Sequence, residues 1–320
     1  MTDRIVILGP TAGGKSEIAL LLAERLAQGE GRASGLPGAE IVGADSRQIY
    51  RGLEVGTAAP SAADRGRAPH HLASFLPPSE VYSAGRYARE AKRAIADVES
   101  KGKTPVIVGG SGLYLRALLD GLFAGPERDE GIRAGLRARL EADGLGALRA
   151  DLERVDPTAL ESILPGDATR VIRALEVHAL TGRPISALRR EHRNEPTAAM
   201  RFGIRWARAA LAERIEARIR DQLADGFLEE ARALLGAGLP PEAPGLHTLG
   251  YRELLGHLRG ETSLEDAVGA IALRTRQLAK RQETWFRRVP HVRWFTLTSP
   301  AAFPAVASAI EREAATRNRP

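Results

Sequence analysis

The strongest chemical signal is a phosphate-binding motif at residues 9–16, where Gly-Pro-Thr-Ala-Gly-Gly-Lys-Ser fits the pattern G-x-x-x-x-G-K-[ST]. Glycines let backbone N–H groups turn inward on an anion, and a helix that begins here adds its dipole. Lys15 adds a positive charge, and the Ser16 hydroxyl can bind Mg²⁺. A glycine-rich turn that binds nothing is the alternative. Because an apolar segment precedes the motif and a helical one follows it, we favour a loop that binds a diphosphate or triphosphate, here called the P-loop. Its expected ligands are Gly9, Pro10, Thr11, Ala12, Gly13, Gly14, Lys15 and Ser16.

Two further polar side chains follow apolar segments that are typical of strands. Asp45 lies in ADSRQIYRG, after residues 40–44, and Ser111 lies in GGSGLY, after residues 104–108. Asp45 is either a metal ligand or general base, or the N-cap of a helix. The residues alone favour neither interpretation over the other. Ser111 either offers its hydroxyl to a diphosphate or Mg²⁺, or caps a helix. Because all three loops follow strand ends, we expect them to face one crevice.

These motifs require strands that alternate with helices. Short apolar segments predict the strands, helical periodicity predicts the connections, and this order gives a parallel sheet with crossovers. Strands are expected at residues 4–8, 40–44, 104–108, 201–207 and 291–297, and helices at 16–27, 82–99, 211–235 and 264–288.

Residues 125–196 have a different pattern, with helical segments and no convincing strand. Helices are expected at residues 129–142, 146–155, 157–164 and 168–180. The predicted fold class is therefore α/β, a P-loop NTPase-like parallel sheet core with a mainly helical insertion domain. We expect residues 1–124 and 197–320 to form the core, and residues 125–196 to form the insertion.

The composition excludes several classes of protein. Of 320 residues, 43% are hydrophobic and 27% are charged, which is typical of a globular protein and excludes wholesale disorder. The chain has no cysteine, so disulfides, cysteine-based zinc sites, iron–sulfur clusters and thiol nucleophiles are excluded. The first residues, MTDRIVILG, lack the long apolar stretch and cleavage site of a signal peptide, and we find no apolar run of membrane-spanning length. These features indicate a cytoplasmic protein of enzyme size.

Positive charge is concentrated near the end of the chain. The formal net charge is +6, and arginine, which supplies most of the basic residues, suits phosphate recognition. On composition alone, an anionic partner and an arginine-rich codon usage explain this equally well. Residues 274–293, however, contain one acidic residue, Glu283, and seven basic ones: Arg274, Arg276, Lys280, Arg281, Arg287, Arg288 and Arg293.

Together, these motifs resemble the tRNA dimethylallyltransferase (tRNA isopentenyltransferase) family. The P-loop is an ATP-binding motif shared by many nucleotide-binding families, whereas ADS-x-Q-x-Y, GG-x-G-LY and RQLAKRQ-x-TW are far more specific. The matching segments extend over nearly the whole chain and are GPTAGGKS, ADSRQIYRGLEVGTAAPS, PHHL, VYSAGRYAREA, PVIVGGSGLYLRALLDGL, TRVIRALEVHALTG, LADGFLEEA, LGYRE and RQLAKRQETWFR.

The resemblance implies a reaction. The enzyme would transfer a dimethylallyl group from dimethylallyl diphosphate to N6 of the adenosine 3′-adjacent to the anticodon in tRNA, with Mg²⁺ as cofactor. The P-loop would hold the donor's diphosphate rather than ATP. Asp45 matches the family's general base for the adenine amine, and Arg218 matches a diphosphate-binding arginine. Ser111 stands where the family usually has threonine, so a hydroxyl for the metal or the diphosphate is retained.

The resemblance also implies contacts with the anticodon stem-loop of tRNA, from which the target base must be extruded. Thr169 replaces a frequent glutamine of the family, His247 a frequent arginine, and Glu253 a frequent glutamine. The expected RNA contacts are Asp45, Ser46, Arg47, Gln48, Arg133, Thr169, Arg170, Arg173, His247, Gly250, Tyr251, Arg252, Lys280, Arg281, Gln282 and Arg287.

Three rival functions are less consistent with these residues. An adenylate isopentenyltransferase would not need the basic late helix or the insertion. A P-loop kinase would need an adenine site and a phosphate-acceptor pocket, for which the sequence gives no independent sign. A non-catalytic RNA-binding module would not need the P-loop with Asp45 and Ser111. We expect a monomeric enzyme that acts on tRNA and does not bind membranes.

Overall fold

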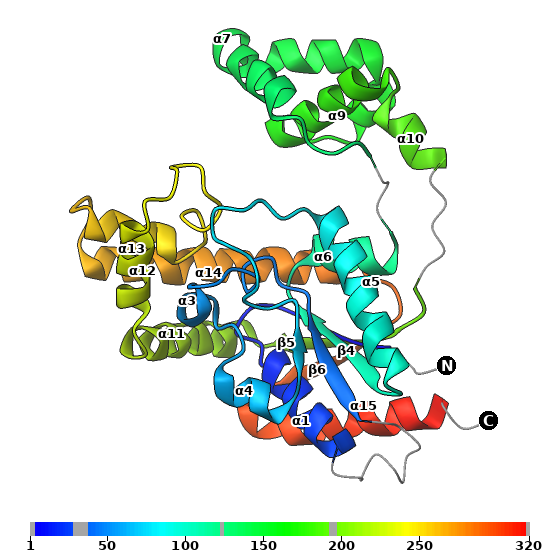
Figure 1. The fold of residues 1–320 in the computed structure, drawn as a ribbon, viewed down its shortest axis with the longest axis vertical. Coiled ribbons are helices and arrows are strands. Elements are labelled where there is room, and N and C mark those ends of the chain that lie inside the picture. The colour runs from blue at the N-terminus through cyan, green and yellow to red at the C-terminus, as the bar shows by residue number, and fades with distance from the viewer. Residues whose placement is uncertain (1–3, 28–37, 122–124, 192–196, 318–320) are drawn as a thin grey trace. The chain divides into compact units, whose positions relative to one another are not determined.

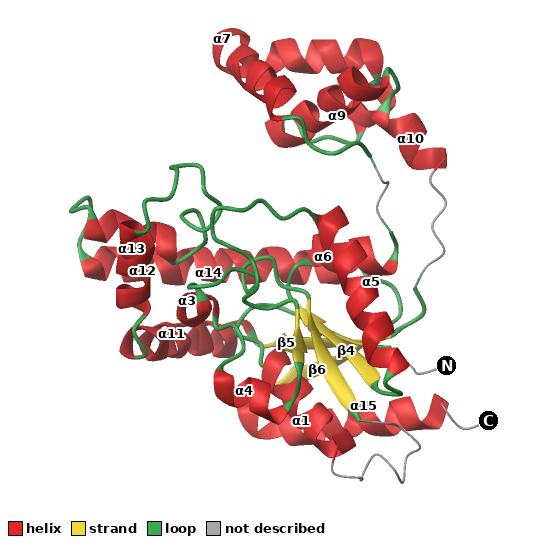
Figure 2. Cartoon of the chain, viewed as in Figure 1, coloured by secondary structure: helices red, strands yellow, loops and turns green. Residues whose placement is uncertain are grey.

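The computed structural model describes residues 4–27, 38–121, 125–191 and 197–317, and it divides into two compact units (Figures 1 and 2). The core unit comprises residues 1–120 and 196–320, and the insertion unit comprises residues 121–195. The boundaries expected at residues 124–125 and 196–197 lie at or beside segments outside the described residues. None of the helices in the described ranges combines the length and apolar composition that a bilayer span requires.

The core unit is built on one six-stranded sheet, in the order β3-β2-β4-β1-β5-β6, in which all neighbouring strands are parallel. This confirms the predicted parallel α/β sheet. Strands β1 and β4 are buried along their length, as expected for parallel strands covered on both faces. The strands are β1 (Ile5–Leu8), β2 (Ala39–Gly43), β3 (His70–His71), β4 (Thr104–Gly109), β5 (Met200–Trp206) and β6 (Val292–Leu297).

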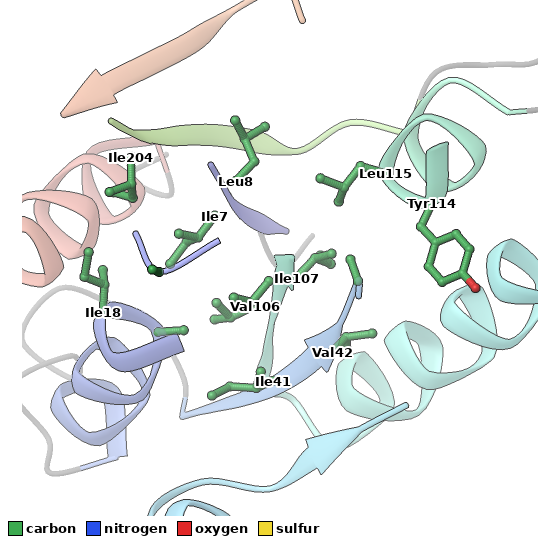
Figure 3. Close-up of a cluster of buried hydrophobic side chains, with 14 of the residues drawn as sticks. Ile7, Leu8, Ile18, Ile41, Val42, Val106, Ile107, Tyr114, Leu115 and Ile204 are labelled. Atoms are coloured by element: carbon green, nitrogen blue, oxygen red, sulfur yellow. The ribbon is translucent and has the colours of Figure 1, made fainter. Parts of the chain in front are cut away.

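Helices cover both faces of this sheet. Helix α1 (Lys15–Ala27) packs against α15 (Phe303–Arg317), and α5 (Ala84–Ser100) packs against α6 (Gly112–Leu119). Figure 3 shows Ile18 of α1 on one side of the strands and Tyr114 and Leu115 of α6 on the other. The apolar side chains of the strands fill the space between, so the sheet and the loops at its ends have a rigid base.

The later helices of the core unit are α11 (Arg208–Ala224), α12 (Phe227–Gly236), α13 (Tyr251–Leu258) and α14 (Leu264–Phe286). The single helix predicted at residues 211–235 is wrong, because α11 ends at Ala224 and Gly226 adopts a left-handed φ of 97°. Helices α13 and α15 and strand β3 were not predicted; β3 has two residues, too few for a periodic signal. The short helices α3 (Glu54–Thr57), α4 (Ala62–Arg67) and η1 (Pro300–Ala302) complete the unit.

The insertion unit consists of helices around a small apolar core of its own. Helix α7 bends at Gly144, whose φ is 76°, which agrees with the two helical segments predicted on either side of it. The core contains Leu148, Leu152, Val171 and Val177. The helices are α7 (Glu130–Val155), α8 (Pro157–Glu161), α9 (Ala168–Thr181) and α10 (Ile185–Glu191), of which α10 was not predicted.

A buried ion pair joins α7 to α9. The Arg133 guanidinium donates two hydrogen bonds to the Glu176 carboxylate, at 2.8 and 3.1 Å, and Arg173 donates a third at 2.7 Å. Burial raises the pKa of Glu176, but the hydrogen bonds from Arg133 and Arg173 outweigh it and lower the pKa to about 2. Arg133 is only 7% exposed. It was expected to contact tRNA, and its burial indicates instead that it stabilises the insertion unit.

Replacing Arg133 by alanine should destabilise the insertion unit by about 3 kcal/mol, because it breaks a buried ion pair and leaves a carboxylate short of partners. The control is Arg170→Ala on α9, whose side chain is 64% exposed and pairs with Asp167; such a surface pair contributes less than about 1 kcal/mol. Hydrogen exchange of the α7 and α9 amides measures the stability of the insertion unit in both variants. Equal protection of these amides in the two variants would contradict the stabilising role of Arg133.

Candidate active site

Four segments of the core unit follow neighbouring strands at the carboxyl edge of the sheet. The P-loop follows β1, the loop of Asp45 follows β2, the loop of Ser111 follows β4, and α11, which carries Arg218, follows β5. The register pairs the last residue of β1 with the last residue of β4, so these strands end at the same level. Ligands of open α/β sheets bind outside this edge, and the side chains with predicted chemistry converge on it.

The P-loop has a tightly wound backbone that excludes larger residues. Gly14 has a φ of 82°, and a Cβ there would lie 2.2 Å from the ring of Phe303. A Cβ on Gly9 would lie 2.5 Å from the carbonyl oxygen of Ile204. Ala12 also has a positive φ, of 58°. Left-handed residues in such a loop direct successive N–H groups to one side, which makes a concavity for an anion at the start of α1.

Two side chains hold the carbonyl groups of the P-loop from outside. The Trp206 indole donates to the Gly13 carbonyl at 3.0 Å, and Arg214 Nε donates to the Ala12 carbonyl at 2.9 Å. The Arg214 guanidinium also lies over the Trp206 ring, 4.5 Å from its centroid. Sequence analysis missed Arg214, although it lies four residues before Arg218 on α11, a spacing that places both arginines on one face of the helix.

Positive charge is desolvated beside the P-loop. Lys15 Nζ donates to the Pro10 carbonyl at 2.7 Å, and burial lowers the pKa of Lys15 to about 8, with Asp45 opposing and Arg218 adding to the shift. Burial also lowers the pKa of Arg218, against the opposing charge of Asp45. The three groups therefore lie within electrostatic range of one another. A bound anion would favour the charged form of both cations.

Asp45 and Ser111 lie on loops that are bonded to each other. Asp45 Oδ1 accepts the Arg47 N–H at 2.9 Å. Ser111 Oγ accepts the Ser46 N–H at 2.8 Å and donates to Ser46 Oγ at 3.2 Å. The helix after Asp45 does not begin until Glu54, and the Ser111 side chain does not cap α6. The alternative that Asp45 is a helix cap is therefore excluded, whereas Ser111 stands at the N-cap position of α6 but uses its side chain to bond to Ser46.

The backbone of α3 is fixed by side chains from other elements. Arg218 donates to the Thr57 carbonyl at 3.0 Å, and the Gln48 amide donates to the Thr57 and Ala58 carbonyls at 3.2 and 2.7 Å. The amide N–H groups of Gln48 therefore bond within the protein, whereas its neighbour Arg47 is exposed. The hydrogen bond to the Thr57 carbonyl also fixes the orientation of the Arg218 guanidinium.

Tyr251, at the start of α13, is fully buried against Phe227. Its hydroxyl donates to Glu230 and accepts the Gly56 N–H at 3.0 Å. Gly250 is also buried. Both residues were expected to contact tRNA, but burial leaves Tyr251 no surface for RNA, and its hydroxyl instead connects α13 to α3.

Other expected contacts near α13 are exposed, including His247 and Arg252. His247 bonds through Nε2 to the Pro241 carbonyl at 2.8 Å. Glu253, one of the three departures from the family pattern, is buried, accepts the Gly250 N–H at 2.6 Å and pairs with Arg274. This departure therefore serves the internal structure of the core unit.

Helix α14 carries an exposed basic face. A hollow of about 440 Å³ on this face is lined by Gln277, Lys280, Arg281, Thr284, Trp285 and Arg288. Arg274 and Arg276 are in ion pairs with Glu253 and Glu216. Lys280, Arg281 and Arg288 have no acidic partner within ion-pair distance among the described residues, and the neighbouring Arg287 is also exposed. Gln282 differs, because it is half-buried and bonded to two loops of the site.

In the insertion unit, two of the four expected RNA contacts are exposed and two are not, one of which is the buried Arg133. Thr169 and Arg170 lie at the exposed start of α9. Arg173 is half-buried, because it bonds to Glu176 and donates to the Pro126 carbonyl at 2.8 Å. The available surface for an anion on α9 is therefore at its first turn.

The oxygen groups at the carboxyl edge suit Mg²⁺, a hard cation that prefers hydroxyl, carboxylate and phosphate oxygens. The Ser16 hydroxyl is exposed at the first turn of α1, and Asp45 Oδ2 accepts no hydrogen bond from the described residues. Among the described residues, a separate group of Glu40, His71 and Asp97 also converges. Lys101 and Lys103 already bond to Glu40, which indicates a charge network rather than a metal site.

Comparisons with known proteins agree with this geometry. A family model described as IPP transferase matches residues 48–289. The tRNA dimethylallyltransferase of Geobacter metallireducens is 43% identical over 311 residues, which is 97% of this chain and 96% of that protein. The tRNA dimethylallyltransferase 1 of Citrifermentans bemidjiense is 44% identical over 304 residues, or 94% of each chain.

Solved structures show the same fold. The full-length tRNA isopentenylpyrophosphate transferase of Bacillus halodurans aligns with a TM-score of 0.68 and 31% identity, over 99% of each chain. A eukaryotic dimethylallyltransferase acting on tRNA aligns with a TM-score of 0.81 and 26% identity, over all of this chain and 81% of that one. The resemblance inferred from the motifs is confirmed, and the chain belongs to the IPP transferase family, whose matched relatives are tRNA dimethylallyltransferases.

Proposed function

We propose that this chain transfers a dimethylallyl group from dimethylallyl diphosphate to N6 of the adenosine 3′-adjacent to the anticodon of tRNA. The observation that carries the proposal is the convergence of Lys15, Arg218 and Asp45 beside the P-loop. Two half-buried cations suit a diphosphate, and a carboxylate within their electrostatic range suits an acceptor that must lose a proton. The relatives named tRNA dimethylallyltransferase support the choice of donor and acceptor.

The proposed reaction forms one bond and breaks another. The N6 amine attacks the allylic carbon, the carbon–oxygen bond to the diphosphate breaks, and the amine proton passes to Asp45. An exocyclic adenine amine is a poor nucleophile, because its lone pair is delocalised into the ring, and a positioned base assists it. The P-loop N–H groups, Lys15 and Arg218 stabilise the charge that develops on the leaving diphosphate.

The proposal includes Mg²⁺, with Ser16 and Ser111 as the hydroxyl groups that would hold it. The ion would supply further neutralisation of the leaving group. Ser111 Oγ accepts the Ser46 N–H and donates its hydrogen to Ser46 Oγ, so its second lone pair remains for a metal. We also propose that the enzyme acts as a monomer and in the cytoplasm, where its substrate tRNA is found.

The proposed RNA contacts are exposed residues, which each unit presents on its own surface. These are Arg47, Thr169, Arg170, His247, Arg252, Lys280, Arg281 and Arg287, with Asp45 and Ser46 at the target base. Unpaired cations on α14 favour RNA as acceptor over a free nucleotide, since a nucleotide requires no extended basic face. Phosphate contacts of this kind release counterions and make binding sensitive to salt.

The reaction is tested by incubating the protein with labelled dimethylallyl diphosphate, Mg²⁺, and either unmodified tRNA, AMP, or ATP with candidate acceptors. Label should enter tRNA alone, and no phosphate should pass from ATP to an acceptor.

Asp45→Asn should lower kcat about 10²- to 10⁴-fold, because the amide cannot accept the proton. The amide oxygen can still accept the Arg47 N–H, so the Kd for tRNA should change little. Equal losses of turnover and tRNA affinity would make Asp45 a binding residue.

Binding of pyrophosphate should weaken as the pH rises through 8. The pKa of Lys15 is lowered to about 8 in the free site, and a bound anion raises it, so binding above this pH requires proton uptake. The affinity should then fall by up to about tenfold per pH unit. Titration calorimetry measures the affinity at each pH, and the same measurement on Lys15→Gln gives the part of the pH dependence that comes from ionisation of pyrophosphate itself. Parallel pH profiles of the two proteins would refute the role of the Lys15 charge.

Arg281→Glu should weaken tRNA binding and flatten its dependence on salt, because a phosphate contact on α14 is lost. The charge-matched control is Arg312→Glu, an exposed position on α15. Filter binding at several salt concentrations gives both slopes. If the two variants have the same slope, the basic face of α14 is not part of the RNA surface.

A further inference from the structure

Gln282 forms a bridge between two of the loops at the carboxyl edge. Its Oε1 accepts the Thr11 N–H of the P-loop at 2.8 Å, and its Nε2 donates to the Gly110 carbonyl at 2.9 Å. One amide thus supplies an acceptor to the loop after β1 and a donor to the loop after β4. Lysine and arginine have no acceptor, and carboxylates have no donor when ionised, so among the long, flexible polar side chains only the amide of glutamine supplies both bonds.

The surrounding backbone is shaped to admit this side chain. A Cβ on Gly110 would lie 2.5 Å from Gln282 Nε2, and a Cβ on Gly112 would lie 2.5 Å from the Trp285 indole. Both contacts come from α14, which packs against α6. The glycines of the third loop therefore allow the close approach of α14, and Gln282 occupies the space that a side chain at position 110 would take.

The bridge continues to the proposed general base. Gly110 is adjacent to Ser111, whose hydroxyl bonds to Ser46, the residue after Asp45. A connected series of contacts thus runs from the P-loop through Gln282 to the Asp45 loop. The two ends of the series are the groups that would hold the leaving diphosphate and accept the proton.

We propose that Gln282 is a positioning residue for group transfer, which sets the spacing between the P-loop and the loop of the general base. This inference rests on the proposed function. It reassigns Gln282, which was expected among the tRNA contacts, because its amide is already used within the protein. Since Lys280 and Arg281 on the same helix face outward, α14 presents a basic face to one side and fixes the site on the other.

Replacing Gln282 by alanine should lower kcat about 10- to 100-fold, the scale expected when reacting groups are misplaced by about 1 Å. The Kd for tRNA should stay within about twofold, since no RNA contact is lost. Leu273→Ala, at a position 51% exposed on the same helix, is the control and should leave kcat unchanged. A normal kcat at saturating tRNA with a raised Kd for tRNA would overturn the proposal and return Gln282 to the RNA surface.

Gln282→Glu separates positioning from loss of packing, because it retains the size of the side chain. One carboxylate oxygen can still accept the Thr11 N–H, whereas the other opposes the Gly110 carbonyl and cannot donate. The kcat should fall as in Gln282→Ala while the unfolding temperature stays close to that of the unaltered protein. A normal kcat in Gln282→Glu would show that only the volume of residue 282 matters.

A double variant tests the contact itself. Gly110→Ala alone should displace the Gln282 amide and lower kcat, whereas adding Gly110→Ala to Gln282→Ala should cost little more, since the obstructing atom is gone. Independent, multiplied losses would overturn the inference. The unaltered protein in the same assay distinguishes the two proposals: if it transfers no prenyl group, the proposed function fails, and if it does so while Gln282→Ala is unaffected, only this inference fails.

Discussion

The site depends on positive charge that the fold partly buries at the carboxyl edge of the sheet. Burial lowers the pKa of both Lys15 and Arg218, which means that the empty site disfavours the charges it needs. An anionic ligand offsets this penalty, because it favours the charged form of both side chains. The desolvation cost of these cations is incurred when the protein folds, so it is not incurred again when diphosphate binds. Asp45 partly compensates these charges in the free site, and the same proximity places it where a proton acceptor is useful once the anion binds.

Maintaining such a site requires that flexible loops be held by distant parts of the chain. Glycines give the P-loop its close approach and its left-handed turns, but they also give it conformational freedom in the unfolded state. Trp206, Arg214 and Gln282 bond to its backbone from β5, α11 and α14, which follow the first half of the core in sequence. The second half of the core thus immobilises the phosphate-binding loop of the first, and the insertion interrupts the chain between them.

The sequence predicted the parts of the site that follow from a local pattern. The P-loop, the strands before it and after it, and the polar loops of Asp45 and Ser111 were all accessible from residue types and spacing. Arg133, Tyr251 and Gln282 were assigned to RNA by resemblance, yet they turn inward. Their partners Glu176, Glu230 and Gly110 are distant in sequence. No local period distinguishes an arginine that pairs with a buried carboxylate from one that faces solvent, so these roles required the fold.

Helix α14 carries both the residues proposed to bind RNA and the residue proposed to position the site. A helix repeats about every 3.6 residues, so Lys280 and Arg281 can face outward while Gln282 and Phe286 face the protein, as the burial of these residues shows. A sequence motif that spans residues 280–286 therefore combines residues that face outward with residues that pack against the protein. The proposed RNA surface and the P-loop are therefore connected through a single helix, because Gln282 of α14 bonds directly to the Thr11 N–H.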